Sequence, residues 1–270
     1  MKNSVKVIAL VLAAVVCFGI FAGCAKKSDN NSKETLVMAT NASFPPYEYK
    51  EGDNFAGIDV EIAGLIAEKL GMELKIEDVD FGSIIGGVQT GKFDMGMAGM
   101  TVNEERKQSV NFSNTYANGI QAVIVAADSE YASFEDFYTE FDAEGNPVGV
   151  KEGIKIGVQQ DTTGDIYSSD EPANWGFGED NVIRYKTGND AVQALKAGKV
   201  TAVIIDNEPA KSYVSANEGL KILDGEYTNE DYAICVAKEN TELLDKINKA
   251  LEELTAEGKI QEILDKYIKK

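Results

Sequence analysis

The chain of 270 residues contains no histidine, and this absence removes several kinds of chemistry at once. Ser-His-Asp and Cys-His catalysis, histidine general bases and every His-ligated metal site are excluded. Carboxylate, Lys, Tyr and Ser/Thr groups are what remains for chemistry. Binding without catalysis is therefore the better starting hypothesis, and neither a cofactor nor a metal is expected.

Positive charge is also scarce, because 26 Lys and Arg stand against 45 Asp and Glu and give a net charge of −19. A chain with this much negative charge repels the phosphate backbones of nucleic acids, which argues against a nucleic-acid partner. The composition is otherwise that of a soluble globular protein, 44% hydrophobic and 26% charged. The length corresponds to about two domains.

Cysteine use is sparse and divided between the N-terminus and the fold. Cys17 lies in an apolar run, Cys24 follows that run, and only Cys235 is left for the folded part. A single cysteine cannot form an internal disulfide. Because Ile234 and Val236 flank Cys235, we expect it to be buried as a small apolar residue.

The apolar run at residues 7–21 is too short to cross a membrane comfortably, since about 20 residues are needed. It suits a signal peptide over residues 1–23. The run ends in Phe-Ala-Gly-Cys and a polar stretch follows, which resembles a bacterial lipobox, although Phe21 stands where Leu is usual. We therefore expect a lipidated (palmitate-bearing) Cys24 and a tether over residues 24–33. The alternative is an uncleaved N-terminal anchor helix.

Short apolar strands alternate with amphipathic helices along the rest of the chain. The pattern predicts strands at residues 36–39, 74–76, 95–98, 122–126, 155–158, 182–185, 202–205 and 233–237. It predicts helices at residues 58–70, 84–90, 103–109, 189–197, 209–216, 242–256 and 260–268. This alternation favours an α/β fold with largely parallel sheets.

Polar and aromatic residues gather in four loops that follow predicted strands. These loops are residues 40–44, 98–101, 159–164 and 206–207. Open α/β sheets bind ligands beyond the carboxyl ends of their strands. The sequence therefore predicts one cleft that is lined by all four loops.

Two charged residues in or near these loops each have two interpretations. Arg106 could grip a carboxylate with its planar fork, or it could be a solvated arginine beside Glu104 and Glu105. Asp206 could accept an ammonium group, or it could cap the helix that follows it. Taken singly, the structural interpretation is the stronger one for each.

The remaining loop residues are equally ambiguous one by one. Thr163 lies at the start of a helix, where free N–H groups can bind anions. A plain helix-capping role for this segment explains the sequence equally well. Phe44 and Phe81 could sandwich an apolar stem, or they could belong to the core. The methionines at 95, 97 and 100 indicate packing, not a metal site. Together, an arginine, an aspartate and two aromatic rings describe a site for a free α-amino acid.

The chain resembles a known family over residues 34–270, the polar amino-acid-binding proteins of bacterial ABC importers. This extracytoplasmic solute-binding family includes the glutamine- and lysine/arginine/ornithine-binding proteins. The matching stretches are residues 39–48, 57–60, 94–106, 110–113, 157–164 and 190–206. The resemblance implies the two-lobed fold of periplasmic binding proteins, with a mostly parallel sheet flanked by helices in each lobe.

The resemblance also implies how the chain is divided and what it does. Lobe 1 would comprise residues 34–115 and 233–270, lobe 2 residues 121–227, and the hinge residues 116–120 and 228–232. Hinge closure would trap a polar L-amino acid between the lobes. The protein, a monomer on the outer face of the cell membrane, would deliver this ligand to the permease subunits and their ATPase.

Roles for single residues follow from the same resemblance. Arg106 would hold the α-carboxylate, with help from Thr101 and Gly99, and Asp206 would hold the α-ammonium. Asn41 would meet the ligand's side chain. The full expected ligand-binding set is Asn41, Phe44, Phe81, Ala98, Gly99, Met100, Thr101, Arg106, Asp161, Thr163 and Asp206.

The chain departs from the family pattern at three places. Asp161 replaces a glycine that usually precedes the two threonines. Asn41 is neutral where relatives often carry an acid, which favours a neutral ligand such as glutamine over a basic or sulfur-containing one. The charge of Asp161 could partly restore the case for a cationic ligand. Residues 135–152 form a longer connection than usual, and the stretch 142–147 has strong turn chemistry.

Two other functions stay open at this point. A prephenate/arogenate dehydratase is built on the same scaffold, and Glu48, Asp161 or Glu208 could serve as its general acid. An intact site for a zwitterion is not what such an enzyme requires. A sensor-associated binding protein is the third possibility.

Overall fold

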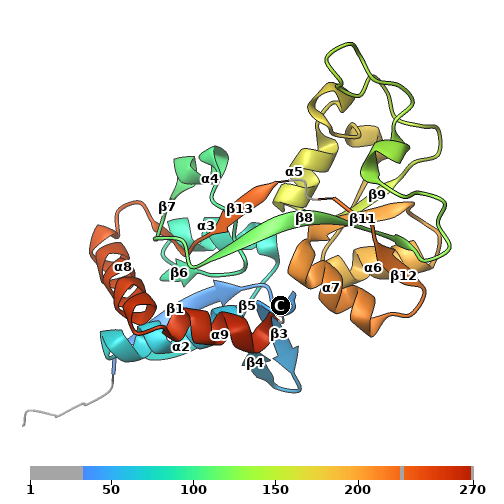
Figure 1. The fold of residues 1–270 in the computed structure, drawn as a ribbon. Helices are drawn as coiled ribbons and strands as arrows, with labels where there is room; N and C mark the ends of the chain where they lie inside the picture. Colours follow the sequence, from blue (N-terminus) through green and yellow to red (C-terminus); the bar gives the residue numbers. More distant parts are fainter. Residues whose placement is uncertain (1–32, 226–227, 269–270) are drawn as a thin grey trace, which may run out of the picture. The chain divides into compact units, whose positions relative to one another are not determined.

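The computed structural model describes residues 33–225 and 228–268, and Figure 1 shows their fold. The signal peptide, Cys24 and all of the tether except Lys33 lie outside the described residues. Two mixed β-sheets organise the chain. The elements that surround the first sheet are named lobe 1 below, and those that surround the second are named lobe 2.

The sheet of lobe 1 has the strand order β5-β1-β6-β14-β7. Strands β5, β1 and β6 run parallel, and β14 pairs antiparallel with both β6 and β7. A small separate sheet, β2-β3-β4, follows β1. The strands are β1 Thr35–Thr40, β2 Ser43–Phe44, β3 Glu48–Glu51, β4 Asn54–Ala56, β5 Glu73–Asp78, β6 Met95–Gly96, β7 Val110–Phe112 and β14 Cys235–Ala237.

Helices cover this sheet because their apolar side chains repeat at helical spacing. In α2, Ile58, Ile62 and Ile66 are fully buried, and the helix ends at Gly71 in the left-handed conformation. Helix α2 packs against α8 and α9, which close the described chain. The helices are α2 Ile58–Leu70, α3 Ile84–Gln89, α4 Glu104–Ser109, α8 Thr241–Ala256, α9 Lys259–Tyr267 and the 3-10 turn η1 Phe81–Ser83.

The sheet of lobe 2 repeats this plan with the order β10-β9-β11-β8-β12. Strands β10, β9 and β11 are parallel, and β8 is antiparallel to β11 and β12. The strands are β8 Ala117–Ala126, β9 Ile156–Gln159, β10 Val182–Tyr185, β11 Ala202–Asp206, β12 Leu220–Ile222 and β13 Asn229–Tyr232. The helices are α5 Thr163–Ser169, α6 Gly188–Lys196, α7 Asn207–Ala216 and the 3-10 turns η2 Phe134–Phe137, η3 Pro172–Asn174 and η4 Glu179–Asn181.

Strand β8 is shared between two pairings, as its length in Figure 1 suggests. Its first residues, 117–120, pair antiparallel with β13, and its later residues pair with β11 and β12. The two segments expected to form the hinge, 116–120 and 228–232, therefore lie side by side as a two-stranded ribbon.

The predicted fold class is confirmed: in each sheet three adjacent strands run parallel, and one strand, β14 in lobe 1 or β8 in lobe 2, runs antiparallel to its neighbours on both sides. The small β2-β4 sheet and strands β7, β12 and β13 were missed, because each is short and mixes polar with apolar residues. Cys235 is buried and free, as predicted. The turn at 142–147 is also present: the Asp142 carboxylate accepts hydrogen bonds from the backbone N–H groups of Glu144 and Asn146. None of the described helices combines the length and apolar character that crossing a bilayer requires.

Candidate functional site

A cavity of about 310 Å³ lies beyond the carboxyl ends of β1, β6, β9 and β11, where the four polar loops were expected to meet. Both lobes contribute to its walls. The lining residues are Asn41, Phe44, Glu48, Phe81, Ala98, Gly99, Thr101, Arg106, Gln159, Thr162, Thr163 and Asp206.

Nine of the eleven residues in the expected ligand-binding set line this cavity, and two do not. Met100 is fully buried and packs in a core cluster with Ile84 and Val88, so its side chain is structural. Asp161 stands beside the cavity, with a positive φ of 65° at a position where glycine is usual in the family. Its carboxylate lies against Gly82 of lobe 1, where an added Cβ would come within 2.1 Å of Asp161 Oδ2.

Three lining residues were absent from that set: Glu48, Gln159 and Thr162. Gln159 ends β9 and Thr162 follows it in the third polar loop, so their position at a strand end was a usable signal. Glu48 belongs to the stretch 39–48 that carries the family resemblance, but it was weighed only as a catalytic acid. Its burial depends on the β2-β4 sheet, which the sequence pattern did not predict.

Arg106 is buried, with 7% of its surface exposed, so the solvated interpretation is wrong. Its backbone N–H donates to Asn103 Oδ1 at 2.8 Å, which caps helix α4 and fixes where the side chain begins. Nη1 donates to the Thr101 carbonyl at 2.8 Å and Nη2 to the Asp161 carbonyl at 3.1 Å. The guanidinium lies 5.2 Å from the Phe81 ring centre. Burial lowers the pKa of Arg106, but a guanidinium stays charged at neutral pH.

Asp206 occupies the N-cap position of α7, yet its side chain makes no capping hydrogen bond. The carboxylate instead accepts from Gln121 Nε2 at 2.8 Å on Oδ1 and from the Tyr232 hydroxyl on Oδ2. The capping interpretation is therefore wrong for the side chain. Burial, followed by the negative charge of Glu230, raises the pKa of Asp206 to about 7.

Three more buried carboxyl groups lie within or beneath the cavity wall: Glu48, Asp59 and Glu230. Asp59 Oδ2 accepts from the Gly99 N–H at 2.8 Å, and Glu230 Oε2 accepts from Gln121 Nε2 at 2.9 Å. Burial raises the pKa of Asp59 to about 6. Burial, followed by the charges of Asp59 and Asp206, raises the pKa of Glu48 well above its usual range. A cation that enters the cavity would pair with these carboxyl groups in their ionised form, so the site favours cationic groups.

The two lobes contact each other across the cavity, and two buried hydrogen-bond acceptors there have no partner among the described residues. Gln159 Nε2 of lobe 2 donates to Asn41 Oδ1 of lobe 1 at 2.9 Å. The other amide atom, Gln159 Oε1, is buried with no partner among the described residues, and the same is true of Glu48 Oε2. An unsatisfied buried acceptor costs about 1–3 kcal/mol. A ligand group rich in N–H donors would remove this cost.

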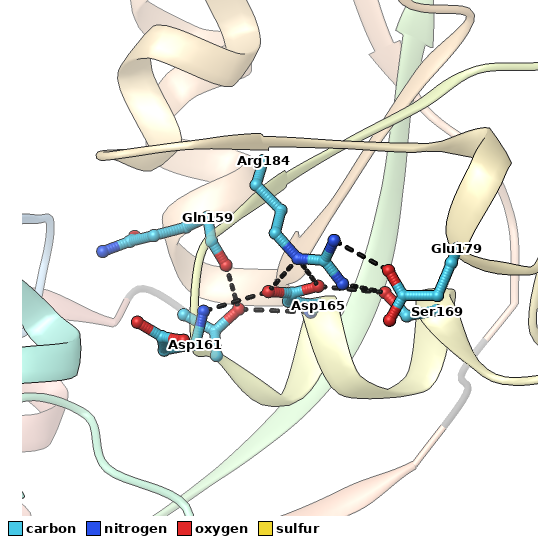
Figure 2. A network of polar contacts seen from close by, with 7 residues as sticks. Gln159, Asp161, Asp165, Ser169, Glu179 and Arg184 are labelled. Carbon is cyan, nitrogen blue, oxygen red and sulfur yellow. Dashed lines mark hydrogen bonds and ion pairs between the residues drawn. The ribbon is translucent and has the colours of Figure 1, made fainter.

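The loop at residues 159–163 is held in place by an ion-pair network in lobe 2 (Figure 2). Asp165 accepts from the Asp161 N–H at 3.0 Å and from Arg184 Nε at 2.8 Å and 2.9 Å. Arg184 also pairs with Glu179 at 2.8 Å, and both partners raise the pKa of Arg184. Thr162 caps α5 by accepting from the Asp165 N–H at 3.3 Å. Thr163 is thereby presented at the first turn of the helix with its hydroxyl beside the cavity.

Replacing Arg184 with methionine is expected to lower the free energy of unfolding by about 1–3 kcal/mol, because the buried Asp165 loses its charged partner. Ligand affinity should fall by about 3- to 10-fold, since the loop that presents Thr163 loses its support. Urea denaturation and calorimetric titration measure the two effects. Lys199→Met removes the same charge from an exposed position and should change neither quantity. If the two substitutions changed stability and affinity equally, Arg184 would not support the loop.

Comparisons with known proteins agree on one family. A model of the bacterial extracellular solute-binding proteins, family 3, matches residues 36–270. The arginine-binding extracellular protein ArtP of Bacillus subtilis (strain 168) is 33% identical over 262 residues, which are 96% of each chain. An L-arginine-binding protein of Pseudomonas aeruginosa is 32% identical over 85% of this chain and 86% of its own.

Solved structures extend the likeness to the fold. An ancestral arginine-binding protein was solved with arginine (37% identity) and with glutamine (36% identity). Each of these structures has a TM-score of 0.76 and matches 88% of this chain and 99% of its own. ArtJ of Geobacillus stearothermophilus, an arginine-, lysine- and histidine-binding protein, gives a TM-score of 0.77 at 28% identity, over 88% and 96% of the two chains.

The family comprises solute-binding proteins, not enzymes, which decides against the dehydratase alternative. Family model, relatives and solved structures all cover nearly the whole described chain. The two-lobed fold, the cavity between strand ends and the sequence therefore lead to one conclusion: the chain belongs to the family 3 bacterial extracellular solute-binding proteins.

Proposed function

We propose that this protein captures a free L-amino acid with a long cationic side chain, arginine foremost, and delivers it to the membrane permease of an ABC importer. The observation that carries the proposal is that Arg106 and Asp206 are both buried and line the same cavity. Neither side chain has the structural role, solvated charge or helix cap, that its local sequence suggested. Opposite charges in one closed cavity match the two charges of a zwitterion.

The α-carboxylate would lie against Arg106, because a guanidinium fork binds a carboxylate with two parallel hydrogen bonds. Thr101 and Thr163 lie beside it from opposite lobes, with their hydroxyl oxygens 3.5 Å apart. A carboxylate oxygen placed between them could accept from both. The α-ammonium would lie against Asp206, which Gln121 and the Tyr232 hydroxyl hold in place.

The side chain of the ligand would extend past Phe44 and Phe81 toward Glu48 and Gln159. The two unpartnered acceptors there, Glu48 Oε2 and Gln159 Oε1, suit a guanidinium, which offers five N–H donors and a charge. The preference for a neutral ligand depended on Asn41 alone and did not include Glu48. The arginine-binding relatives support the revised choice, and the ancestral protein bound to glutamine indicates that a neutral ligand can occupy such a site.

Capture would proceed by hinge closure about the ribbon formed by β8 and β13. We assign residues 34–115 and 233–270 to lobe 1, residues 121–227 to lobe 2, and residues 116–120 and 228–232 to the hinge. Direct contacts between the walls, such as Gln159 with Asn41, would stabilise the closed form. Closure around a ligand excludes water and strengthens each charged contact.

Lipidation of Cys24 after removal of residues 1–23 would tether the protein to the outer face of the membrane. The relatives' names agree with an extracytoplasmic location, as in the arginine-binding extracellular protein of B. subtilis and the arginine-binding periplasmic protein of Mannheimia haemolytica. The names of two Escherichia coli relatives include an ABC transporter, which supports a permease as the partner.

Isothermal titration of the full-length protein with the twenty amino acids, ornithine and citrulline tests this assignment. We expect arginine to bind most tightly. Glu48→Gln should weaken arginine binding by about 10- to 100-fold, because it removes the carboxyl group that would ionise beside the guanidinium, and should change glutamine binding by less than about threefold.

Glu51→Gln is the matched control, because Glu51 lies on the same strand, β3, but is exposed. It should leave both affinities unchanged. An unchanged arginine-to-glutamine ratio in Glu48→Gln would show that the cationic group does not lie at Glu48. Failure of every amino acid to bind would contradict the proposed function itself.

A further inference from the structure

A second and larger cavity, of about 1140 Å³, opens within lobe 2. It lies between helix α5 and the aromatic segment around η2 and η3, and it shares no lining residue with the first cavity. The family resemblance assigns nothing to it. Its walls combine aromatic rings, carboxylates and two buried polar side chains with unused acceptors, which together describe a binding site.

Trp175 forms part of the wall in a conformation that few tryptophans adopt. It has a φ of 65°, in the left-handed region, and its side chain is 39% exposed. Its ring stacks on Phe134 with centres 5.8 Å apart, and the Tyr138 hydroxyl donates to its carbonyl at 2.7 Å. The left-handed conformation costs about 1–2 kcal/mol for a residue with a side chain. A large ring is therefore held at the cavity despite strain and exposure, which is a feature of binding sites.

The charge of the wall has one sign. Glu135, Asp170 and Asp224 line the cavity, and none of the described lining residues is Lys or Arg. Aromatic faces attract cations as well, and Tyr167 and Phe177 add two further rings. A cation is favoured by both components of the wall, whereas an anion or a carboxylate-bearing molecule would be repelled.

Two buried polar atoms in the wall lack hydrogen-bond partners. Ser168 Oγ and Gln121 Oε1 have none among the described residues, although each residue is only 1% exposed. Gln121 cannot easily turn to change this, because its Nε2 donates to Asp206 at 2.8 Å and to Glu230 at 2.9 Å. Its oxygen is thereby left as an acceptor. A ligand with N–H donors would satisfy both atoms.

We propose that this second cavity binds an organic cation that carries no carboxylate, an aliphatic ammonium or guanidinium, between Trp175 and the carboxylates of Glu135 and Asp170. The N–H donors of the ligand would reach Gln121 Oε1 and Ser168 Oγ, and its methylene groups would lie along the aromatic wall. The proposal does not depend on which ligand occupies the first cavity.

Putrescine (1,4-diaminobutane) is the probe, and the protein supplies its own reporter. Trp175 is the one tryptophan in the 270 residues, so a change in tryptophan fluorescence reports on this cavity. The full-length protein is titrated at 150 mM salt by fluorescence and by calorimetry, without and with 10 mM L-arginine. We expect saturable binding that persists in L-arginine, and no binding of 1,4-butanediol, which has the same length and no charge.

The double variant Glu135→Gln/Asp170→Asn should weaken putrescine binding by about tenfold or more. The pair Glu140→Gln/Glu152→Gln is the matched control: it changes the net charge equally at exposed positions outside the cavity, and it should shift the dissociation constant by less than twofold. Equal effects of the two pairs would reveal nonspecific attraction to an acidic protein. Loss of binding in L-arginine would place putrescine in the first cavity, and no binding at 10 mM putrescine would leave the second cavity without this ligand class. Each of these three results overturns the proposal.

Discussion

Replacing Arg106 with alanine is expected to weaken amino-acid binding by about 100-fold or more. Truncating one member of a buried, hydrogen-bonded charge pair costs about 2–5 kcal/mol, and every 1.4 kcal/mol is tenfold in affinity. Arg106→Lys should recover only part of the loss, because a lysine keeps the charge but lacks the planar fork that holds a carboxylate in one orientation. Calorimetric titration with L-arginine and L-glutamine measures both variants.

The neighbouring residue supplies the control for this experiment. Lys107 is exposed and pairs with Glu104 at 2.8 Å on the surface, so Lys107→Ala makes the same change in net charge one residue away. It should leave affinity unchanged, since exposed pairs contribute about 0–1 kcal/mol. Binding by Arg106→Ala within tenfold of the unmodified protein would show that the α-carboxylate lies elsewhere.

Asp206 is expected to make binding depend on pH near neutrality. Its pKa is raised to about 7 in the ligand-free cavity, whereas an ammonium group binds the ionised carboxylate. Below pH 7 the ligand must therefore displace a proton, and the apparent affinity should fall by about tenfold per pH unit. Asp206→Asn should lose about 30-fold or more in affinity at pH 8 and much less at pH 5. The difference between the affinity-against-pH profiles of the unmodified protein and of Asp206→Asn isolates the contribution of the Asp206 carboxyl group.

Stability without ligand should change with pH in the opposite direction. Because the pKa of Asp206 is raised by folding, its contribution to stability is present below the unfolded value of about 3.9 and is lost as the pH rises through about 7. At pH 8, the Asp206→Asn variant should therefore have an unfolding temperature equal to or higher than that of the unmodified protein. The helix should persist, since the Asp206 side chain makes no capping bond. Asp245→Asn, at an exposed position of helix α8, is the control and should alter neither profile. An amino-acid affinity of the unmodified protein that stays constant between pH 5 and pH 8 would contradict an Asp206–ammonium contact.

The position of the site was predictable because strand ends are local in sequence. Each of the four polar loops follows a run of apolar residues, and parallel strands bring such ends to one edge. Nine of the expected residues accordingly line one cavity. Met100 does not line it, because the direction of a side chain just beyond the two-residue strand β6 cannot be read from the sequence.

Whether Arg106 and Asp206 were functional could not be decided locally. Each has a complete structural explanation in its own segment, as a solvated charge or a helix cap. The choice depends on burial by distant residues: Asp161 is 55 positions from Arg106, and Gln121 is 85 positions from Asp206. Contacts at such separations leave no periodic signal in the chain.

By itself, the sequence determined the class of the molecule: an acidic α/β protein without histidine, with strand-end loops suited to a zwitterion, because composition and hydrophobic periodicity act over a few residues. Only the tertiary structure decided which charges are buried together. It brought Glu48 and Gln159 into the cavity with unused acceptors, and it set Trp175 beside Gln121 and Ser168 in a second one. The reason is physical: desolvation and unsatisfied hydrogen bonds belong to the folded arrangement, not to any segment of the chain.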